Sequence, residues 1–191
     1  MRSLRACVPA LLLCLAATTP VAAASIGFTV AGGGGGDGGP AIEAAVDPWQ
    51  VAALGSTVYV ASVSQSTVRR IGSDGVIRAV AGNYLPRPTG DPMPALGQVS
   101  PALGTRLARD VTCAAAVSAD EVYFAAGNTI QLAQGGTLRT VLSGTAADGS
   151  AAFREVGGCL VVGPILYVST DREVLACALP VRARGAARSS C

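Results

Sequence analysis

GGGGGDGGPA, residues 32–41, directly follows the apolar run FTVA of residues 28–31. Phenylalanine, threonine and valine favour a strand, and five consecutive glycines let the backbone turn away from it. Asp37–Gly39 is typical of a turn, and Pro40 cannot continue a strand ladder. Residues 41–46 have room for about one helical turn before Asp47, because a residue that precedes proline avoids the helical region. We therefore expect a strand and a glycine-rich loop to open the first structural unit.

Four short β runs follow this loop, each separated from the next by a turn rich in glycine, serine or aspartate. Their residues are Gln50–Leu54, Val58–Ala61, Thr67–Ile71 and Val76–Val80. Tight turns between apolar, partly β-branched runs are typical of antiparallel hairpins. The unit predicts one antiparallel four-stranded sheet.

The same pattern recurs twice, and each later copy matches the first less closely. VAGN at residues 80–83 repeats VAGG at residues 30–33, and VYFA at residues 122–125 repeats VYVA at residues 58–61. A third copy opens with TVLSG at residues 140–144, continues to Ala176 and has no fourth strand. A fixed internal repeat is the sequence signature of a repeat architecture. The units span roughly residues 28–80, 80–141 and 141–178 of a single domain at 25–180.

With these repeats, the chain resembles the NHL-repeat family of β-propellers. The resemblance rests on Val30–Gly32, the GDGGPA loop at Gly36–Ala41, Pro48, the strand Tyr59–Ala61, and VRRI at Val68–Ile71 before Asp74–Gly75. It implies an all-β fold, a partial β-propeller of about three four-stranded antiparallel blades. The NHL-like lyases that use metal-bound histidines are not a guide to activity here, because this chain has no histidine.

Three blades are fewer than the four to eight of a typical closed propeller. A partial ring has two open edges, and exposed strand edges pair readily with other chains. A homodimer through the open blade edges is therefore one expectation. A truncated or degenerate repeat protein is another.

Residues 1–24 are typical of a secretory signal peptide. Arg2 and Arg5 precede the apolar run Val8–Ala17, and small residues up to Ala24 suit cleavage before Ser25. The apolar run is short for a membrane span. We expect a secreted or extracellular protein with no membrane span and a basic, disordered tail at residues 181–191.

The composition excludes several classes of function. The chain has no lysine and no histidine, and its 14 basic residues, two of them in the predicted signal peptide, face 12 acidic ones. Without lysine it has no P-loop and no Schiff-base cofactor site, and without histidine no Ser–His or Cys–His pair. It lacks the basic stripe of a nucleic-acid-binding protein. We expect no cofactor, no metal and no nucleic-acid partner.

Aspartates recur at equivalent turns, at Asp37, Asp91 and Asp148. They are the candidate ligand-binding residues, and two carboxylates brought together can serve acid–base catalysis or hold calcium. The simpler interpretation is that each aspartate caps its own turn by bonding nearby backbone. The proline-rich residues 83–109 are expected to form an exposed loop, and Trp49 is expected to be a packing anchor between blades.

Four cysteines remain beyond the predicted signal peptide, which makes disulfides plausible in a secreted chain. When the repeats are aligned on Tyr59, Tyr123 and Tyr167, Cys113 and Cys159 fall on the first strands of neighbouring blades and form a candidate pair. Cys177 and Cys191 are the pair left over. Free buried cysteines are the alternative.

The favoured hypothesis is a secreted or cell-surface, non-enzymatic binding module whose loops engage a protein or glycan. The alternative is an extracellular propeller lyase or hydrolase that uses carboxylates or calcium. Both follow from the same repeats, and they differ in whether the recurring aspartates converge.

Overall fold

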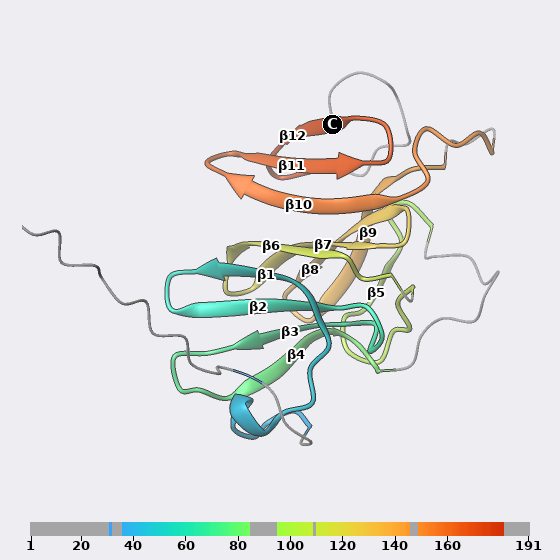
Figure 1. The fold of residues 1–191 in the computed structure, drawn as a ribbon. Coiled ribbons are helices and arrows are strands. Elements are labelled where there is room, and N and C mark those ends of the chain that lie inside the picture. Colours follow the sequence, from blue (N-terminus) through green and yellow to red (C-terminus); the bar gives the residue numbers. More distant parts are fainter. Residues whose placement is uncertain (1–30, 32–35, 85–94, 109, 146–148, 182–191) are drawn as a thin grey trace, which may run out of the picture.

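The chain forms three antiparallel sheets arranged as successive layers (Figure 1). The structure is a computed structural model that describes residues 31, 36–84, 95–108, 110–145 and 149–181. Within these residues the only helical segment is the 3-10 turn η1 (Ala41–Glu43). The prediction of an all-β fold made of antiparallel sheets is therefore confirmed.

The first sheet is a meander with the strand order β1-β2-β3-β4. Its strands are β1 (Pro48–Leu54), β2 (Thr57–Ser62), β3 (Thr67–Ile71) and β4 (Ile77–Gly82). Two of its turns contain Gly55 and Gly75 with positive φ, a conformation that glycine adopts without steric cost. All four predicted β runs are present, with shifts of at most two residues at their ends.

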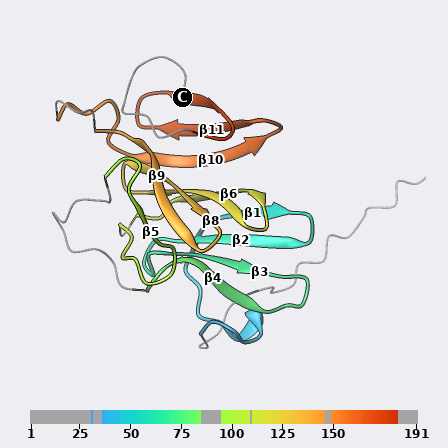
Figure 2. The ribbon, with the colours of Figure 1, turned by 180° about the vertical axis from the view of Figure 1, so that it is seen from behind.

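The second sheet has five strands, in the order β5-β9-β8-β7-β6. They are β5 (Val99–Pro101), β6 (Cys113–Ser118), β7 (Glu121–Ala126), β8 (Thr129–Gln134) and β9 (Thr137–Ser143). β5 lies in the segment predicted to be an exposed loop, and it pairs with β9 through Val99 and Arg139 (Figure 2). The prediction of four strands is wrong here, because the connecting segment adds a short strand to the free edge of β9.

The third sheet has three strands in the order β10-β11-β12 and no fourth among the described residues, as the sequence predicts. They are β10 (Val156–Val162), β11 (Ile165–Thr170) and β12 (Val174–Ala178).

Two apolar clusters fill the spaces between the layers. One joins Tyr59 and Val68 of the first sheet to Phe124 of the second. The other joins Tyr123 and Ile130 of the second sheet to buried residues of the third. A third, smaller cluster covers the far face of the first sheet with η1. Each predicted repeat thus contributes one sheet, and the core lies between successive sheets.

The first strands of the sheets, β1, β6 and β10, are in contact with one another, and a disulfide joins the last two. Cys113 of β6 and Cys159 of β10 have Cα atoms 5.6 Å apart, so the predicted bridge is confirmed. Cys177 is also disulfide-bonded. Its partner lies outside the described residues, as Cys191 does, so that pairing stays a prediction.

Gln50, and not Trp49, ties these first strands together. The Gln50 side chain donates to the Cys159 carbonyl at 3.2 Å and accepts from the Ala114 amide at 2.9 Å. Trp49 is 66% exposed, so its prediction as a packing anchor is wrong. Successive residues of a strand point to opposite faces of the sheet. In β1 the side chain of Gln50 points toward the neighbouring strands, and that of Trp49 points to solvent.

Gly82, the last residue of β4, and Gly144, the residue after β9, stand where no side chain fits. A Cβ on Gly82 would overlap the Ser66 carbonyl oxygen, and one on Gly144 would overlap the Phe153 carbonyl oxygen. Phe153 belongs to the core cluster between the second and third sheets. At both positions a side chain is excluded because a second backbone segment lies too close.

We expect Gly144→Ala to lower the free energy of unfolding by about 1–3 kcal/mol, because the added methyl group displaces a packed segment. Urea unfolding followed by circular dichroism measures this. Gly39→Ala is the matched control, since a Cβ there meets nothing within 4 Å. Equal stability of the two variants would contradict the steric explanation.

No helix among the described residues is long and apolar enough to cross a membrane. The predicted signal peptide and the predicted site residues Asp91 and Asp148 lie outside the described residues. Of the predicted tail at 181–191 only Val181 is described, and the prediction of disorder is wrong for it, because it is buried and its amide donates to the Tyr123 hydroxyl.

Candidate binding site

Asp37, the one predicted site residue that the structure describes, forms an ion pair with Arg69 of β3. The Arg69 Nε donates to Asp37 Oδ1 at 2.8 Å, and the Ala79 amide donates to Asp37 Oδ2 at 2.9 Å. Asp37 thus joins the glycine-rich loop to β3 and to β4. The interpretation of Asp37 as a local turn cap is wrong, because both oxygens accept from strands more than 30 positions away.

Arg69 is almost fully enclosed, with 1% of its side chain exposed. It donates a second hydrogen bond, from Nη1 to the Ala45 carbonyl, and its guanidinium lies 5.6 Å from the Tyr84 ring centroid. Burial, and secondly a hydrogen bond to Asp37, raise the pKa of Tyr84. Each oxygen of the Asp37 carboxylate thus accepts a hydrogen bond from the first sheet.

The second sheet has a buried polar residue at the same place. Register aligns Tyr59 with Arg70 and Tyr123 with Leu132, so Gln131 occupies the position of Arg69. Gln131 is fully buried and bonds to the hydroxyls of Thr129 and Thr140. A buried, hydrogen-bonded polar residue thus stands at this position in two of the three sheets. Asp37 therefore has a structural role in this arrangement.

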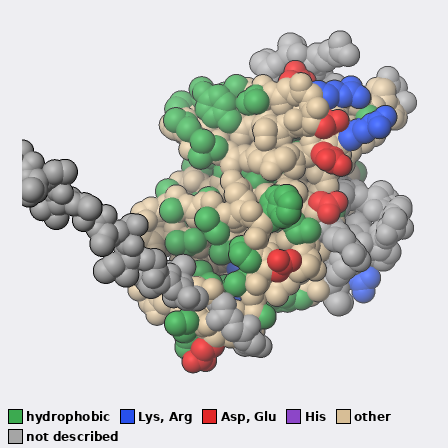
Figure 3. Space-filling view, viewed as in Figure 1, with side chains coloured by type: hydrophobic (Ala, Val, Ile, Leu, Met, Phe, Trp, Pro, Cys, Tyr) green, Lys and Arg blue, Asp and Glu red, His purple; other side chains and the backbone are tan. Residues whose placement is uncertain are grey.

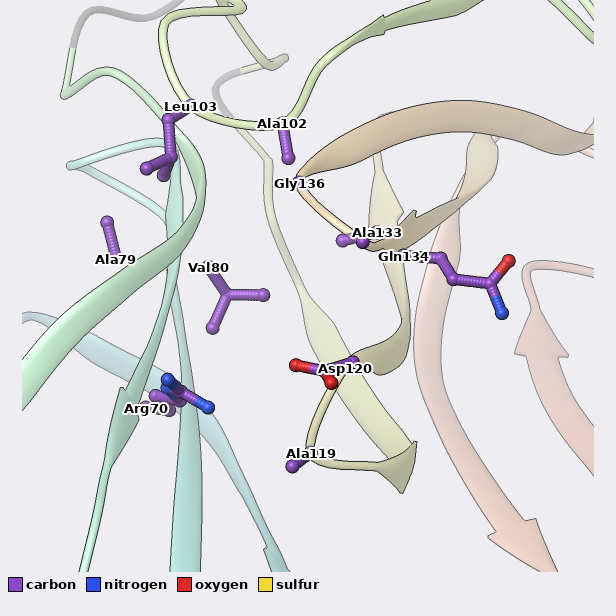
Figure 4. A pocket seen from close by; sticks show the side chains of 11 residues that line it. Arg70, Ala79, Val80, Ala102, Leu103, Ala119, Asp120, Ala133, Gln134 and Gly136 are labelled. Carbon is purple, nitrogen blue, oxygen red and sulfur yellow. The ribbon is translucent and has the colours of Figure 1, made fainter.

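A groove of about 170 Å³ lies between the first and second sheets (Figure 4). We call it the inter-sheet groove. Strands β3 and β4 form one wall, and the turns β6–β7 and β8–β9 form the other. Its lining residues are Arg70, Ala79, Val80, Ala102, Leu103, Ala119, Asp120, Ala133, Gln134, Gly135 and Gly136.

Arg70 and Asp120 supply opposite charges to this mostly apolar groove. They stand on opposite walls (Figure 4), and no ion pair joins these two described residues. The hydroxyl of the buried Tyr59 donates to the Ser118 carbonyl at 3.4 Å. The pKa of Tyr59 is raised, chiefly by burial; Asp120 adds to this shift and Arg70 opposes it. The charges of Arg70 and Asp120 therefore both reach the Tyr59 hydroxyl.

The groove carries a cation, an anion and small apolar side chains, and its lining contains no serine, threonine or cysteine. Within the described ranges no group of three metal-binding side chains is present. This arrangement suits binding of a group with its own charge, flanked by apolar surface. The sequence does not reveal the groove, because Arg70 and Asp120 line one groove only when the first two sheets are stacked.

No protein-family model matches the chain, and no curated protein matches it.

Proposed function

We propose that the chain is a secreted or cell-surface NHL-like partial propeller that acts as a non-enzymatic protein-binding module. In this interpretation the three sheets are blades, and β1, β6 and β10 are their innermost strands. Support comes from the repeats in the sequence and from the contacts among these three strands. The Cys113–Cys159 disulfide suits an oxidising compartment.

The observation that carries the binding role is the inter-sheet groove with Arg70 and Asp120 on opposite walls. Pockets for drug-sized ligands have volumes of about 300–1,000 Å³, so a volume of about 170 Å³ is too small for one. It suits a single side chain from a protein partner. Protein interfaces depend on a few such anchored side chains.

The proposed partner is a protein that inserts one polar or charged side chain between Arg70 and Asp120. The apolar part of that side chain would contact Val80 and Leu103, which line the same groove. Charged groups on both walls fix the orientation of the inserted group and reject groups of the wrong polarity. Specificity would thus come from charge and affinity from apolar contact.

A phage-displayed peptide library tests this role. We expect the native chain to enrich a family of related peptides, and Arg70→Glu/Asp120→Arg to bind them about tenfold more weakly or worse, because each wall then carries the opposite charge. The matched control is Arg78→Glu/Asp74→Arg, which swaps the same residue types in an exposed ion pair outside the groove.

Equal binding by the groove variant, or no enriched peptide at all, would contradict the proposal. A glycan array probed in parallel identifies the other outcome, in which the chain binds carbohydrate and not peptide.

A further inference from the structure

Two opposite charges face each other across the inter-sheet groove. Arg70 enters it from β3, and Asp120 enters it from the turn between β6 and β7 (Figure 4). Among the described residues neither side chain takes part in an ion pair. The rest of the lining is uncharged. The groove therefore has no net charge, but an electric field runs from one wall to the other.

A charged guest group gains little from such a pair of walls. An ammonium or carboxylate group between them is attracted by one wall and repelled by the other, and it also gives up its hydration. An uncharged group with a large dipole is attracted at both ends, because its negative end lies near the cation and its positive end near the anion. An amide group has such a dipole, of about 3.5 D. The charge pattern therefore favours a neutral, dipolar guest.

Hydrogen bonding narrows the choice of guest further. The Arg70 guanidinium only donates and the Asp120 carboxylate only accepts, so the guest must offer an acceptor to one wall and a donor to the other. A carboxamide does this with two different atoms, its carbonyl oxygen and its amide nitrogen. A hydroxyl group must do it with a single oxygen and so spans a narrower gap. Both hydrogen bonds of a carboxamide would be charge-assisted, which is the stronger kind.

The remaining lining suits the apolar stem of such a side chain. Val80 and Leu103 supply apolar surface, and the alanines leave room beside it. Gln134 is the one carboxamide in the lining, and its side chain is directed away from Arg70 and Asp120 (Figure 4). Over the third sheet, by contrast, hydrophobic side chains gather at one end and charged ones lie at the other (Figure 3). In the groove both kinds of contact are available to one guest.

We propose that the inter-sheet groove binds the carboxamide side chain of a glutamine or asparagine in a partner protein. The carbonyl oxygen of the guest accepts from the Arg70 guanidinium, and its amide nitrogen donates to the Asp120 carboxylate. The methylene groups of the guest contact Val80 and Leu103. The inference rests on the binding role proposed above, and it narrows the inserted group from any polar or charged side chain to an uncharged one.

This arrangement rejects the side chains that most resemble glutamine. Glutamate has nearly the same shape, but its charge is repelled by Asp120, which is then left without a donor. Methionine is similar in length, but it leaves the charged groups of both walls partly desolvated and without hydrogen-bond partners. Selectivity for an amide therefore requires both Arg70 and Asp120.

The peptides that the phage library enriches test this selectivity. We expect them to share one position that is glutamine or asparagine. Synthetic peptides in which that residue is replaced by the corresponding acid, or by methionine, should bind about tenfold more weakly or worse. Fluorescence polarisation with labelled peptides measures the dissociation constants.

Asp120→Asn tests the role of the wall charges. Because only Arg70 is then charged, the variant should prefer the acidic peptide to the amide peptide, which reverses the preference of the native chain. Arg70→Met is a second variant and should prefer a peptide with lysine at the shared position. The matched control is Asp74→Asn, which removes a carboxylate from an exposed ion pair outside the groove and should keep the native preference. Circular dichroism checks that the variants fold.

Equal binding of the amide and acidic peptides by the native chain would overturn the inference, as would an Asp120→Asn variant that still prefers the amide. Enriched peptides that require Arg70 and Asp120 but share a charged residue would refute the carboxamide guest alone and leave the proposed function intact. A library that yields no enriched peptide would refute the proposed function itself, and this inference with it.

Discussion

Replacing both Cys113 and Cys159 with alanine is expected to lower the free energy of unfolding by about 4 kcal/mol. The two residues are 46 positions apart, and closing a loop of this length in the unfolded chain removes about that much entropy. For a domain of this size the melting temperature should fall by about 8–16 °C. Scanning calorimetry under non-oxidising, non-reducing conditions measures the difference.

A strong reductant supplies the control for this prediction. Under reduction the native chain loses the Cys113–Cys159 bridge, and both proteins lose the Cys177 bridge. The difference in stability that remains then reports only the replacement of two buried cysteine side chains by alanine. That residual difference should be small. A gap between native chain and variant that persists unchanged in reductant would show that packing, and not the cross-link, is responsible.

This disulfide could be predicted from the sequence because its position depends on the repeat. Tyr59, Tyr123 and Tyr167 occupy equivalent second strands, so counting back from them places each cysteine on a first strand. The strands themselves follow from local signals, since glycine and aspartate turns interrupt apolar runs. A contact between equivalent positions of two repeats can therefore be predicted from the sequence alone.

Contacts that occur in only one repeat, or that join two repeats, could not be predicted from the sequence. Val99–Pro101 forms a strand because β9 offers a free edge, and nothing within that proline-rich segment favours pairing. Asp37 has the sequence context of a turn, but its partner Arg69 is 32 residues away. The inter-sheet groove combines residues from two repeats. Such features depend on how the sheets stack, which local patterns do not encode.

Asp37→Ala is expected to lower the free energy of unfolding by about 3–5 kcal/mol, because it leaves the enclosed Arg69 guanidinium without its counter-charge. The variant also loses the bond from the Ala79 amide, which ties the glycine-rich loop to β4. Chemical denaturation in urea measures the change. Asp74→Ala is the matched control, since Asp74 pairs with Arg78 in solvent and its loss should change stability little.

The double variant Asp37→Ala/Arg69→Met distinguishes an unpaired charge from a lost loop contact. Methionine keeps most of the apolar volume of the arginine and removes the charge, so the double variant should be more stable than Asp37→Ala alone. If Arg69→Met gives no recovery, the loss in Asp37→Ala comes from release of the loop. Recovery would show that the aspartate of the GDGGPA loop is retained chiefly to neutralise an arginine that the first sheet encloses.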